Sequence, residues 1–337
     1  MKREFRLSTR REFLGQSAGA LALLSAIAAQ RASAAPTRAR NPFAYDVSRL
    51  EKTDPRLVTH HEVARWPAPQ SPARRLGLAP DGTLFVCGGH YVTAVSPAGE
   101  RGLEIALSAP PECVAVAEDG AIFVGLRDHI EVFDANGRRR ASWDAPGRKS
   151  WLTALAVRAD DVFVADAGQR VLLRYDRSGK LLARLGEKNR ERGIPGFIVP
   201  SPFFDVKVAP DGLLRVTNPG RHRVELYTPE GDFEGAWGRA SMDITGFSGC
   251  CNPISLALLP DGRHVTCEKG LPRVKVYSAT GEFESVVAGV ESFAANAKAC
   301  GASDCSRGGL DAVADAQGRI FILDRVTAEV RVMQRRA

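Results

Sequence analysis

Four cysteines and one histidine in the second half of the chain are the residues best suited to chemistry. Cys250 and Cys251 are adjacent in "FSGCCNP", and Cys300 and Cys305 lie in "ACGASDCSRGG". Thiolates, together with an imidazole such as that of His222, are good ligands for zinc, copper or iron. These five residues are therefore the predicted metal ligands, for a transition metal or an iron–sulfur centre.

Two other interpretations of the four cysteines stay open. Cys300 can bridge to Cys305, and Cys250 can bridge to Cys251 or to the segment that holds the other two, because an exported chain keeps its disulfides. One of the thiols can instead be redox-active or nucleophilic. The chain has seven cysteines, and this odd number leaves at least one outside any intramolecular bridge.

Basic residues close to the cysteine pair suit an anionic ligand. Lys269 and Arg273 occur in "CEKGLPRVKVY", and either side chain at a channel mouth would hold a carboxylate. A solvated loop with a surface ion pair is the structural alternative. Together with His222, Cys250 and Cys251, they form the predicted ligand-binding set. The sequence shows no Ser-His-Asp pattern, paired carboxylates or phosphate loop, so no catalytic residue is assigned and enzymatic activity is left open.

A sixfold internal repeat carries these residues. Each copy has an apolar run ending in Pro-Asp-Gly or a variant, a Phe-Val type strand, a short polar loop, and an alternating strand such as "RVELYTP". Period-two alternation between turns indicates strands, and four strands in a unit of roughly 40–50 residues indicate a propeller blade. We predict an all-β, six-bladed propeller over residues 56–337, with its ring closed by an N-terminal strand from residues 56–69.

The repeats resemble the NHL family of six-bladed propellers. The segments "VADAGQRVLLRYDRSGK" (164–180) and "VTNPGRHRVELYTPEG" (216–231) loosely match the family pattern Val-Ala-Asp-x-x-Asn-His-Arg-Ile/Val. Residues 247–277 are similar to those of exported NHL-like proteins with a Cys-Cys-Asn-Pro loop, which implies a shared site. The resemblance names no reaction, because this fold hosts both enzymes and binding modules.

Propeller topology predicts which residues share a face. The loops between second and third strands lie on the same face as the connections between blades, and loops carry function while strands hold the shape. This face is expected to collect His90, His129 and His222 together with the two cysteine pairs. By contrast, Cys87, Cys113 and Cys267 fall on strands and are expected to be buried, and Asp205 and Asp311 at first-strand starts are expected to make structural hydrogen bonds.

The N-terminus resembles a twin-arginine (Tat) signal. Arg10 and Arg11 precede Phe13-Leu14, an apolar run over residues 18–29, and a small-residue cleavage site at residues 32–34. We therefore divide the chain into a signal peptide (1–34), a linker (35–55) and the propeller (56–337). The expected location is the periplasm or the extracellular space, reached through the Tat export machinery, without stable membrane insertion after cleavage.

Charge points away from nucleic acid as a partner. The formal net charge is +7, but residues 1–34 hold six basic residues against two acidic ones, which leaves +3 for the mature chain. The main hypothesis is an exported monomeric propeller that binds a small molecule, a metal or a protein redox partner through its Cys/His face. The alternatives are a metal-dependent lyase or oxidoreductase, and an interaction scaffold with a patch of Phe197, Phe203, Phe204 and Phe247.

Overall fold

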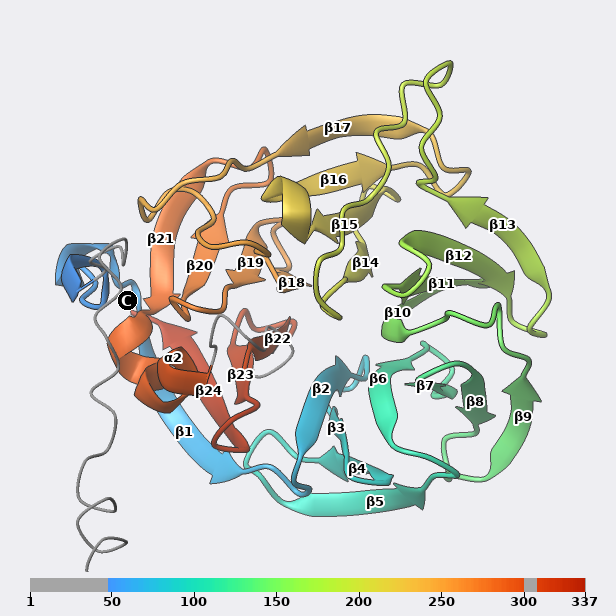
Figure 1. Ribbon diagram of the computed structural model, residues 1–337. Helices are drawn as coiled ribbons and strands as arrows, with labels where there is room; N and C mark the ends of the chain where they lie inside the picture. Colours follow the sequence, from blue (N-terminus) through green and yellow to red (C-terminus); the bar gives the residue numbers. More distant parts are fainter. Residues whose placement is uncertain (1–47, 300–307, 337) are drawn as a thin grey trace, which may run out of the picture. The chain divides into compact units, whose positions relative to one another are not determined.

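The computed structural model describes residues 48–299 and 308–336. The predicted signal peptide, Cys300 and Cys305 lie outside these described residues. Within this part, six four-stranded antiparallel sheets are arranged as the blades of a propeller (Figure 1). The innermost strands of all six blades line one central channel. The prediction of an all-β propeller with six blades is confirmed.

Each of the first five blades is built from four consecutive strands, which follow one another from the channel outward. Blade one is β2 (Ala73–Leu78), β3 (Leu84–Gly88), β4 (Tyr91–Val95) and β5 (Arg101–Ala106); blade two is β6 (Pro111–Val116), β7 (Ile122–Leu126), β8 (Ile130–Phe133) and β9 (Arg139–Trp143); blade three is β10 (Leu152–Arg158), β11 (Asp161–Asp166), β12 (Val171–Asp176) and β13 (Leu181–Leu185). Blade four is β14 (Val206–Val208), β15 (Leu214–Asn218), β16 (Arg223–Tyr227) and β17 (Phe233–Trp237); blade five is β18 (Ser255–Leu258), β19 (His264–Cys267), β20 (Val274–Tyr277) and β21 (Phe283–Ala288).

Blade six joins the two ends of the propeller. It consists of β22 (Leu310–Ala314), β23 (Ile320–Asp324), β24 (Glu329–Arg335) and the N-terminal strand β1 (His60–Pro67). The antiparallel register runs from His60 opposite Arg335 to Pro67 opposite Glu329. This pairing covers the edge of β24, which would otherwise present unpaired backbone groups. The predicted closure by the N-terminal segment is confirmed.

Asp-Gly turns join the first and second strands of several blades. Gly82, Gly212 and Gly262 have φ angles of +87°, +87° and +84°, a region that residues with a Cβ rarely adopt. In the first of these turns, the Asp81 carboxylate accepts a hydrogen bond from the backbone N–H of Thr83 at 2.8 Å. The Pro-Asp-Gly signal in the sequence therefore marks tight hairpins.

A repeated contact holds neighbouring blades together. A large side chain at the end of an outer strand packs against a turn glycine of the next blade: Trp66 against Gly99, Trp143 against Gly179, and Trp237 against Gly281. A Cβ placed on Gly281 would lie 2.2 Å from the Trp237 ring, so only glycine fits this position. Aromatic residues here stabilise the joints because they bury a large apolar area.

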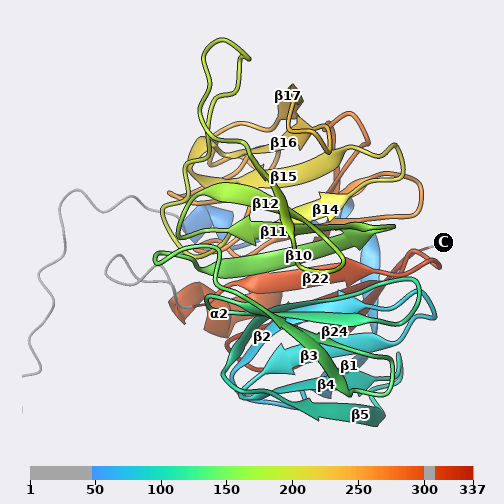
Figure 2. The same ribbon diagram turned by 90° about the vertical axis from the view of Figure 1, so that its right-hand side faces the viewer.

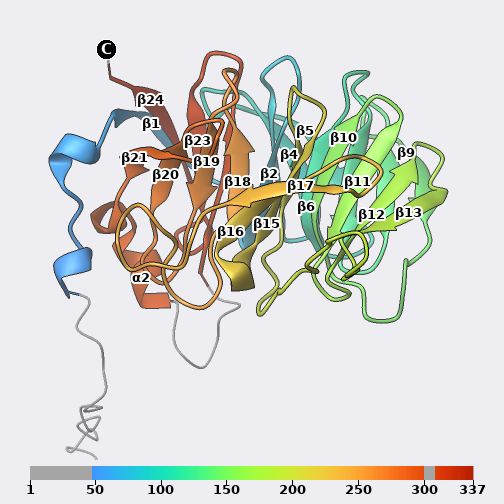
Figure 3. The same cartoon turned by 90° about the horizontal axis from the view of Figure 1, so that it is seen from above.

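One face of the propeller carries the longer connections. The short helix α2 (Ala294–Ala299) lies on the same side as the loops between blades, and the Asp-Gly hairpins lie on the opposite side (Figure 3). The connection from β13 to β14 extends beyond the rim of the ring (Figures 1 and 2). The remaining helices are single 3₁₀ turns, η1 (Ser48–Leu50), η2 (Pro55–Leu57), η3 (Pro219–Arg221) and η4 (Val290–Phe293). No helix in residues 48–299 and 308–336 combines the length and apolarity needed to span a lipid bilayer.

Candidate functional site

A buried ion network closes the central channel just below its loop-bearing mouth. Arg75 on β2 donates from Nη1 to Asp311 Oδ1 at 2.6 Å and to Asp205 Oδ2 at 3.1 Å, and from Nε to the Thr153 carbonyl at 3.1 Å. Ser255 Oγ lies 2.6 Å from Asp311 Oδ1 and 3.2 Å from Asp205 Oδ2, so its single proton is shared between the same two carboxylates. These residues come from blades one, three, four, five and six, so the network fixes most of the ring at one point.

Backbone groups complete the network. The N–H of Leu76 donates to Asp311 Oδ2 at 2.7 Å, and the N–H of Leu256 donates to Asp205 Oδ2 at 2.9 Å. Burial opposes the charge on Asp205, but Arg75 and Lys207 outweigh it and hold the pKa of Asp205 below its usual value. The structural hydrogen-bond role predicted for Asp205 and Asp311 is confirmed.

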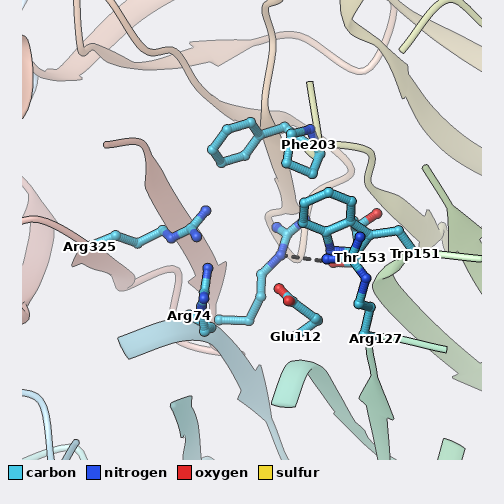
Figure 4. A pocket seen from close by; sticks show the side chains of 9 residues that line it. Arg74, Glu112, Arg127, Trp151, Thr153, Phe203 and Arg325 are labelled. Atoms are coloured by element: carbon cyan, nitrogen blue, oxygen red, sulfur yellow. Dashed lines mark hydrogen bonds between the residues drawn. The ribbon is translucent and has the colours of Figure 1, made fainter. Parts of the chain in front are cut away.

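A cavity of about 260 Å³ lies above this network and is rich in arginine (Figure 4). Arg74 and Glu112 enter it from the starts of β2 and β6, and Arg127 and Arg325 enter it from the loops after β7 and β23. Trp151, which precedes β10, lines the same cavity. Its other lining residues are Arg75, Thr153, Pro202 and Phe203.

The positive charges of the guanidinium groups in this cavity have few negative charges near them among the described residues. Within the described part of the chain, Arg74, Arg127 and Arg325 form no ion pair, and Glu112 is the one carboxylate that lines the cavity. Burial, together with repulsion from Arg74 and Arg75, lowers the pKa of Arg325 to about 10. Among the described lining residues, three cations against one carboxylate leave two net positive charges, since Asp205 and Asp311 already neutralise Arg75.

Aromatic rings orient two of these arginines. The Arg127 guanidinium carbon lies 3.9 Å from the centroid of the Trp151 ring, and that of Arg325 lies 5.1 Å from the Phe203 ring. Contacts of this kind stabilise a cation without neutralising it. The sequence analysis missed this cluster because it followed cysteine and histidine. The propeller topology could have predicted this cluster, because the starts of first strands and the loops between second and third strands meet at the channel mouth.

The cysteine pair lies on the connection between blades four and five. The Sγ atoms of Cys250 and Cys251 are 3.3 Å apart, well beyond the bonded distance of about 2.05 Å. Cys250 is exposed and Cys251 is buried. Burial opposes the thiolate of Cys251, but a hydrogen bond with Ser201 and the charge of Lys269 outweigh it and lower the pKa of Cys251.

Asn252 ties the cysteine loop to the neighbouring hairpin. Its amide nitrogen donates to the carbonyls of Ser248 and Lys269 at 2.6 and 3.0 Å, and its Oδ1 accepts from the Lys269 N–H at 2.9 Å. All three residues are buried. The Asn that follows the Cys-Cys pair in the sequence therefore acts as a two-sided clamp.

A buried charge cluster supports this loop from below. Glu268 accepts a bidentate contact from Arg273, at 3.1 and 2.9 Å, and pairs with Lys275 Nζ at 2.8 Å. Lys275 also donates to the carbonyls of Ile244 and Gly246. Burial raises the pKa of Glu268, but Lys275 and Arg273 outweigh this and lower it, while burial lowers the pKa of Lys275 to about 8.

The structure separates the residues of the predicted ligand-binding set. Arg273 is 2% exposed and points into blade five toward Glu268, so the ion pair is buried rather than on a solvated loop. Lys269 is also buried; its Nζ donates to Ser201 Oγ at 3.2 Å and lies 4.4 Å from the Phe203 ring centroid. His222 contacts the Gly249 carbonyl through Nε2 at 2.8 Å, one residue before the cysteine pair. Thus Lys269, Cys250 and Cys251 come together, with His222 beside their loop.

The other histidines are spread around the ring. His90 is exposed on blade one, His129 pairs with Asp128 on blade two at 2.8 Å, and His264 is buried against Trp237 in blade five. Among the residues that the structure describes, no three His, Cys, Asp or Glu side chains are placed to hold a metal ion. Cys300 and Cys305 lie outside those residues, so the predicted metal set stays a prediction.

Residues expected to be structural are buried. Cys87, Cys113 and Cys267 are 0%, 2% and 0% exposed, as predicted. The four phenylalanines of the possible interaction patch are also buried: Phe197, Phe203, Phe204 and Phe247. They pack in the interior rather than forming an exposed apolar surface, which corrects the basis of the scaffold hypothesis.

No family model matches the chain, and no curated protein matches its sequence. Solved structures do resemble it. A streptogramin B lyase superposes with a TM-score of 0.55 and 11% identity over 82% of this chain and 97% of that chain. The virginiamycin B lyase of Staphylococcus aureus superposes with a TM-score of 0.56 and 12% identity over 82% and 99%. The chain shares their fold.

A catalytically inactive variant of virginiamycin B lyase from Staphylococcus aureus, with quinupristin, also resembles the chain. It has a TM-score of 0.52 and 12% identity over 80% of this chain and 82% of that chain. At such identities the likeness concerns the path of the backbone, because function depends on the side chains of a site.

Proposed function

We propose that this protein binds a small anionic molecule in the arginine cavity at the channel mouth. The observation that carries the proposal is the convergence of Arg74, Arg127 and Arg325, without ion-pair partners among the described residues, on one cavity. Arginine binds carboxylate and phosphate through paired, charge-assisted hydrogen bonds. Like charges crowded in a cavity repel each other, so an anion that enters relieves this repulsion.

The cavity suits a small ligand with more than one negative charge. Its volume of about 260 Å³ lies just below the range of roughly 300–1,000 Å³ that is typical of drug-sized ligands. Two net positive charges favour a dicarboxylate or a phosphate ester over a monoanion. The buried Arg75 network forms a rigid floor, which lowers the entropy lost on binding.

Calorimetric titration with phosphate, succinate and citrate tests the proposal. Arg74→Met and Arg325→Met should each weaken binding about 10- to 100-fold, the effect of losing one charged hydrogen-bond donor of about 1.5–3 kcal/mol. Arg138→Met is the matched control, because Arg138 is exposed in the β8–β9 turn, outside the cavity. Equal affinity in all three variants, or no binding of any of the anions by the wild type, would refute the site.

Lyase chemistry is the second candidate, and the position of Glu112 favours it. This carboxylate shares the cavity with three guanidinium groups. It would abstract a proton as a general base while the arginines stabilise the negative charge that develops on the substrate. Solved structures with this fold include lyases. Glu112→Gln should abolish turnover of a carboxylate substrate while retaining its binding; unchanged turnover would exclude this role.

The proposed place of action is outside the cytoplasm. One support is the Arg10-Arg11 pattern, which resembles a Tat signal. The other is the resemblance of the repeats to those of exported NHL-like propellers. Replacing both arginines by lysine should retain the full-length chain in the cytoplasm, as measured by fractionation and immunoblotting. Normal export of that variant would argue against the Tat route.

A further inference from the structure

The cysteine pair lies beside the arginine cavity. Phe203 contacts both sites: its ring lies 5.1 Å from the Arg325 guanidinium and 4.4 Å from Lys269 Nζ. Lys269 in turn reaches Ser201, which hydrogen-bonds Cys251. The proposed anion site does not include Cys250, Cys251, Ser201 or Lys269, so anion binding does not explain the cysteine pair.

We propose that Cys250 and Cys251 are a redox-active dithiol that exchanges with low-molecular-weight disulfides. Cys250 is exposed to solvent, whereas Cys251 is 1% exposed. Their sulfurs are 3.3 Å apart, within reach of a direct attack of one on the other. Cys250 is therefore the attacking residue and Cys251 the resolving residue.

The exchange proceeds in two balanced steps. The Cys250 thiolate attacks one sulfur of a disulfide RSSR, a Cys250–SR bond forms, and the S–S bond of RSSR breaks with release of RS⁻. The Cys251 thiolate then attacks Cys250 Sγ and expels the second RS⁻. The two cysteines lose two electrons and two protons, and RSSR takes these up to become two RSH molecules.

The surroundings of Cys251 support its role as the resolving thiolate. Cys251 is buried within 3.3 Å of Cys250 Sγ, so it is the sulfur placed to attack a mixed disulfide on Cys250. Ser201 and Lys269 lie beside it and fix its surroundings. The lysine is held in place by its contacts with Ser201 Oγ and the Phe203 ring.

The other described cysteines lie on strands, away from the Cys250–Cys251 pair. Burial raises the pKa of Cys87 to about 12, and it raises the pKa values of Cys113 and Cys267 well above the ordinary value. Buried cysteines of that kind are inert. The contrast within one chain separates the dithiol from cysteines that serve only packing.

The loop that holds the pair is built to fix its geometry. Asn252 clamps the loop to the backbone of Lys269, and Glu268 holds Ser248 through its N–H at 3.0 Å. His222 contacts Gly249 from the neighbouring blade. A loop used only as a connection would not need buried polar contacts at this density, since each one costs desolvation energy.

Peptide mass spectrometry after reaction with oxidised glutathione tests the proposal directly. Trypsin cleaves after Arg239 and Arg263, and the peptide 240–263 carries Cys250 and Cys251 as its only cysteines. After alkylation of remaining thiols, the oxidised wild type should yield this peptide two hydrogens lighter than the reduced form, without an alkyl group. Treatment with reduced glutathione should restore two alkylation sites.

Single variants separate the two steps. Cys251→Ser should stop at a stable glutathione adduct on Cys250, and Cys250→Ser should slow adduct formation at least tenfold because Cys251 is buried. Cys87→Ser is the matched control and should leave both steps unchanged.

Four results would overturn the proposal. In folded wild-type protein, the peptide 240–263 could remain fully reduced at every glutathione potential tested. It could instead keep a stable glutathione adduct, or become linked by a disulfide to another peptide. About one equivalent of transition metal per native chain, lost in Cys250→Ser, would likewise show that the pair ligates metal instead. Circular dichroism of each variant verifies that the propeller is folded before the exchange is measured.

Discussion

Arg75 of blade one lies 3.1 Å from Asp205 of blade four, directly across the central channel. The same guanidinium nitrogen also contacts Asp311 of blade six at 2.6 Å. Burial opposes the charge on Arg75, but the two aspartates outweigh it and raise the pKa of Arg75. One side chain thus connects opposite sides of the ring and forms the floor of the proposed anion site.

Loss of this connection should destabilise the whole propeller. Arg75→Met leaves the carboxylates of Asp205 and Asp311 buried without their shared cation, and breaking a buried pair in this way costs about 3–5 kcal/mol. Urea unfolding followed by fluorescence measures the change. Arg138→Met, at an exposed turn, should change the free energy of unfolding by less than about 0.5 kcal/mol. A similar small effect for Arg75→Met would mean that solvent reaches the network.

The charge cluster below the cysteine loop should be similarly sensitive. Glu268→Gln leaves Arg273 and Lys275 as buried cations, with an expected loss of about 3–5 kcal/mol in unfolding free energy. The loop at residues 244–253 should also exchange its amide hydrogens faster, because Ser248 loses a charged acceptor. Glu282→Gln, on the exposed rim of the same blade, is the control. Unchanged exchange in the loop would show that Asn252 alone suffices to hold it.

Substitutions at two glycines should separate the cost of a steric clash from the cost of backbone strain. Gly281→Ala places a Cβ against Trp237 and also forces alanine to φ +90°, so we expect a loss of about 2–4 kcal/mol. Gly82→Ala has nearly the same φ, +87°, but open space around the new Cβ. It should cost about 1 kcal/mol, which is the backbone contribution alone. If both variants lost the same unfolding free energy in thermal or urea unfolding, packing against Trp237 would not be the cause of the loss in Gly281→Ala.

Ring closure should weaken in acid through His60. Burial, together with the charges of Arg335 and Arg263, lowers the pKa of His60 to about 4. The unfolded chain binds a proton near pH 6.5 and the folded chain only near pH 4, so stability falls as the pH falls through this window, by on the order of 2 kcal/mol. His60→Gln should flatten this slope, measured by urea unfolding at several pH values. His61→Gln, at the exposed neighbour, should leave it intact; if both variants behave alike, His60 is not the responsible group.

The sequence alone determined the fold, because its signals are local. Alternating strands such as "RVELYTP" and turns such as Asp81-Gly82 follow from backbone sterics and short-range burial. The number of repeats predicted the number of blades. The sixth repeat lacks a fourth strand, so the N-terminal segment was predicted to supply it, and this segment is β1. The pattern also distinguished Cys87, Cys113 and Cys267, which lie on strands, from the pair at residues 250 and 251, which lies on a connection between blades.

Only the tertiary structure decided which charges meet. Arg74, Arg127 and Arg325 are far apart in the chain, and nothing in their neighbours along the sequence distinguishes them from surface arginines. Arg273 and Lys269 are four residues apart, yet one points into the blade toward Glu268 and the other toward Cys251. A side chain's electrostatic role depends on what surrounds it within a few ångströms, and in a propeller those neighbours come from different blades.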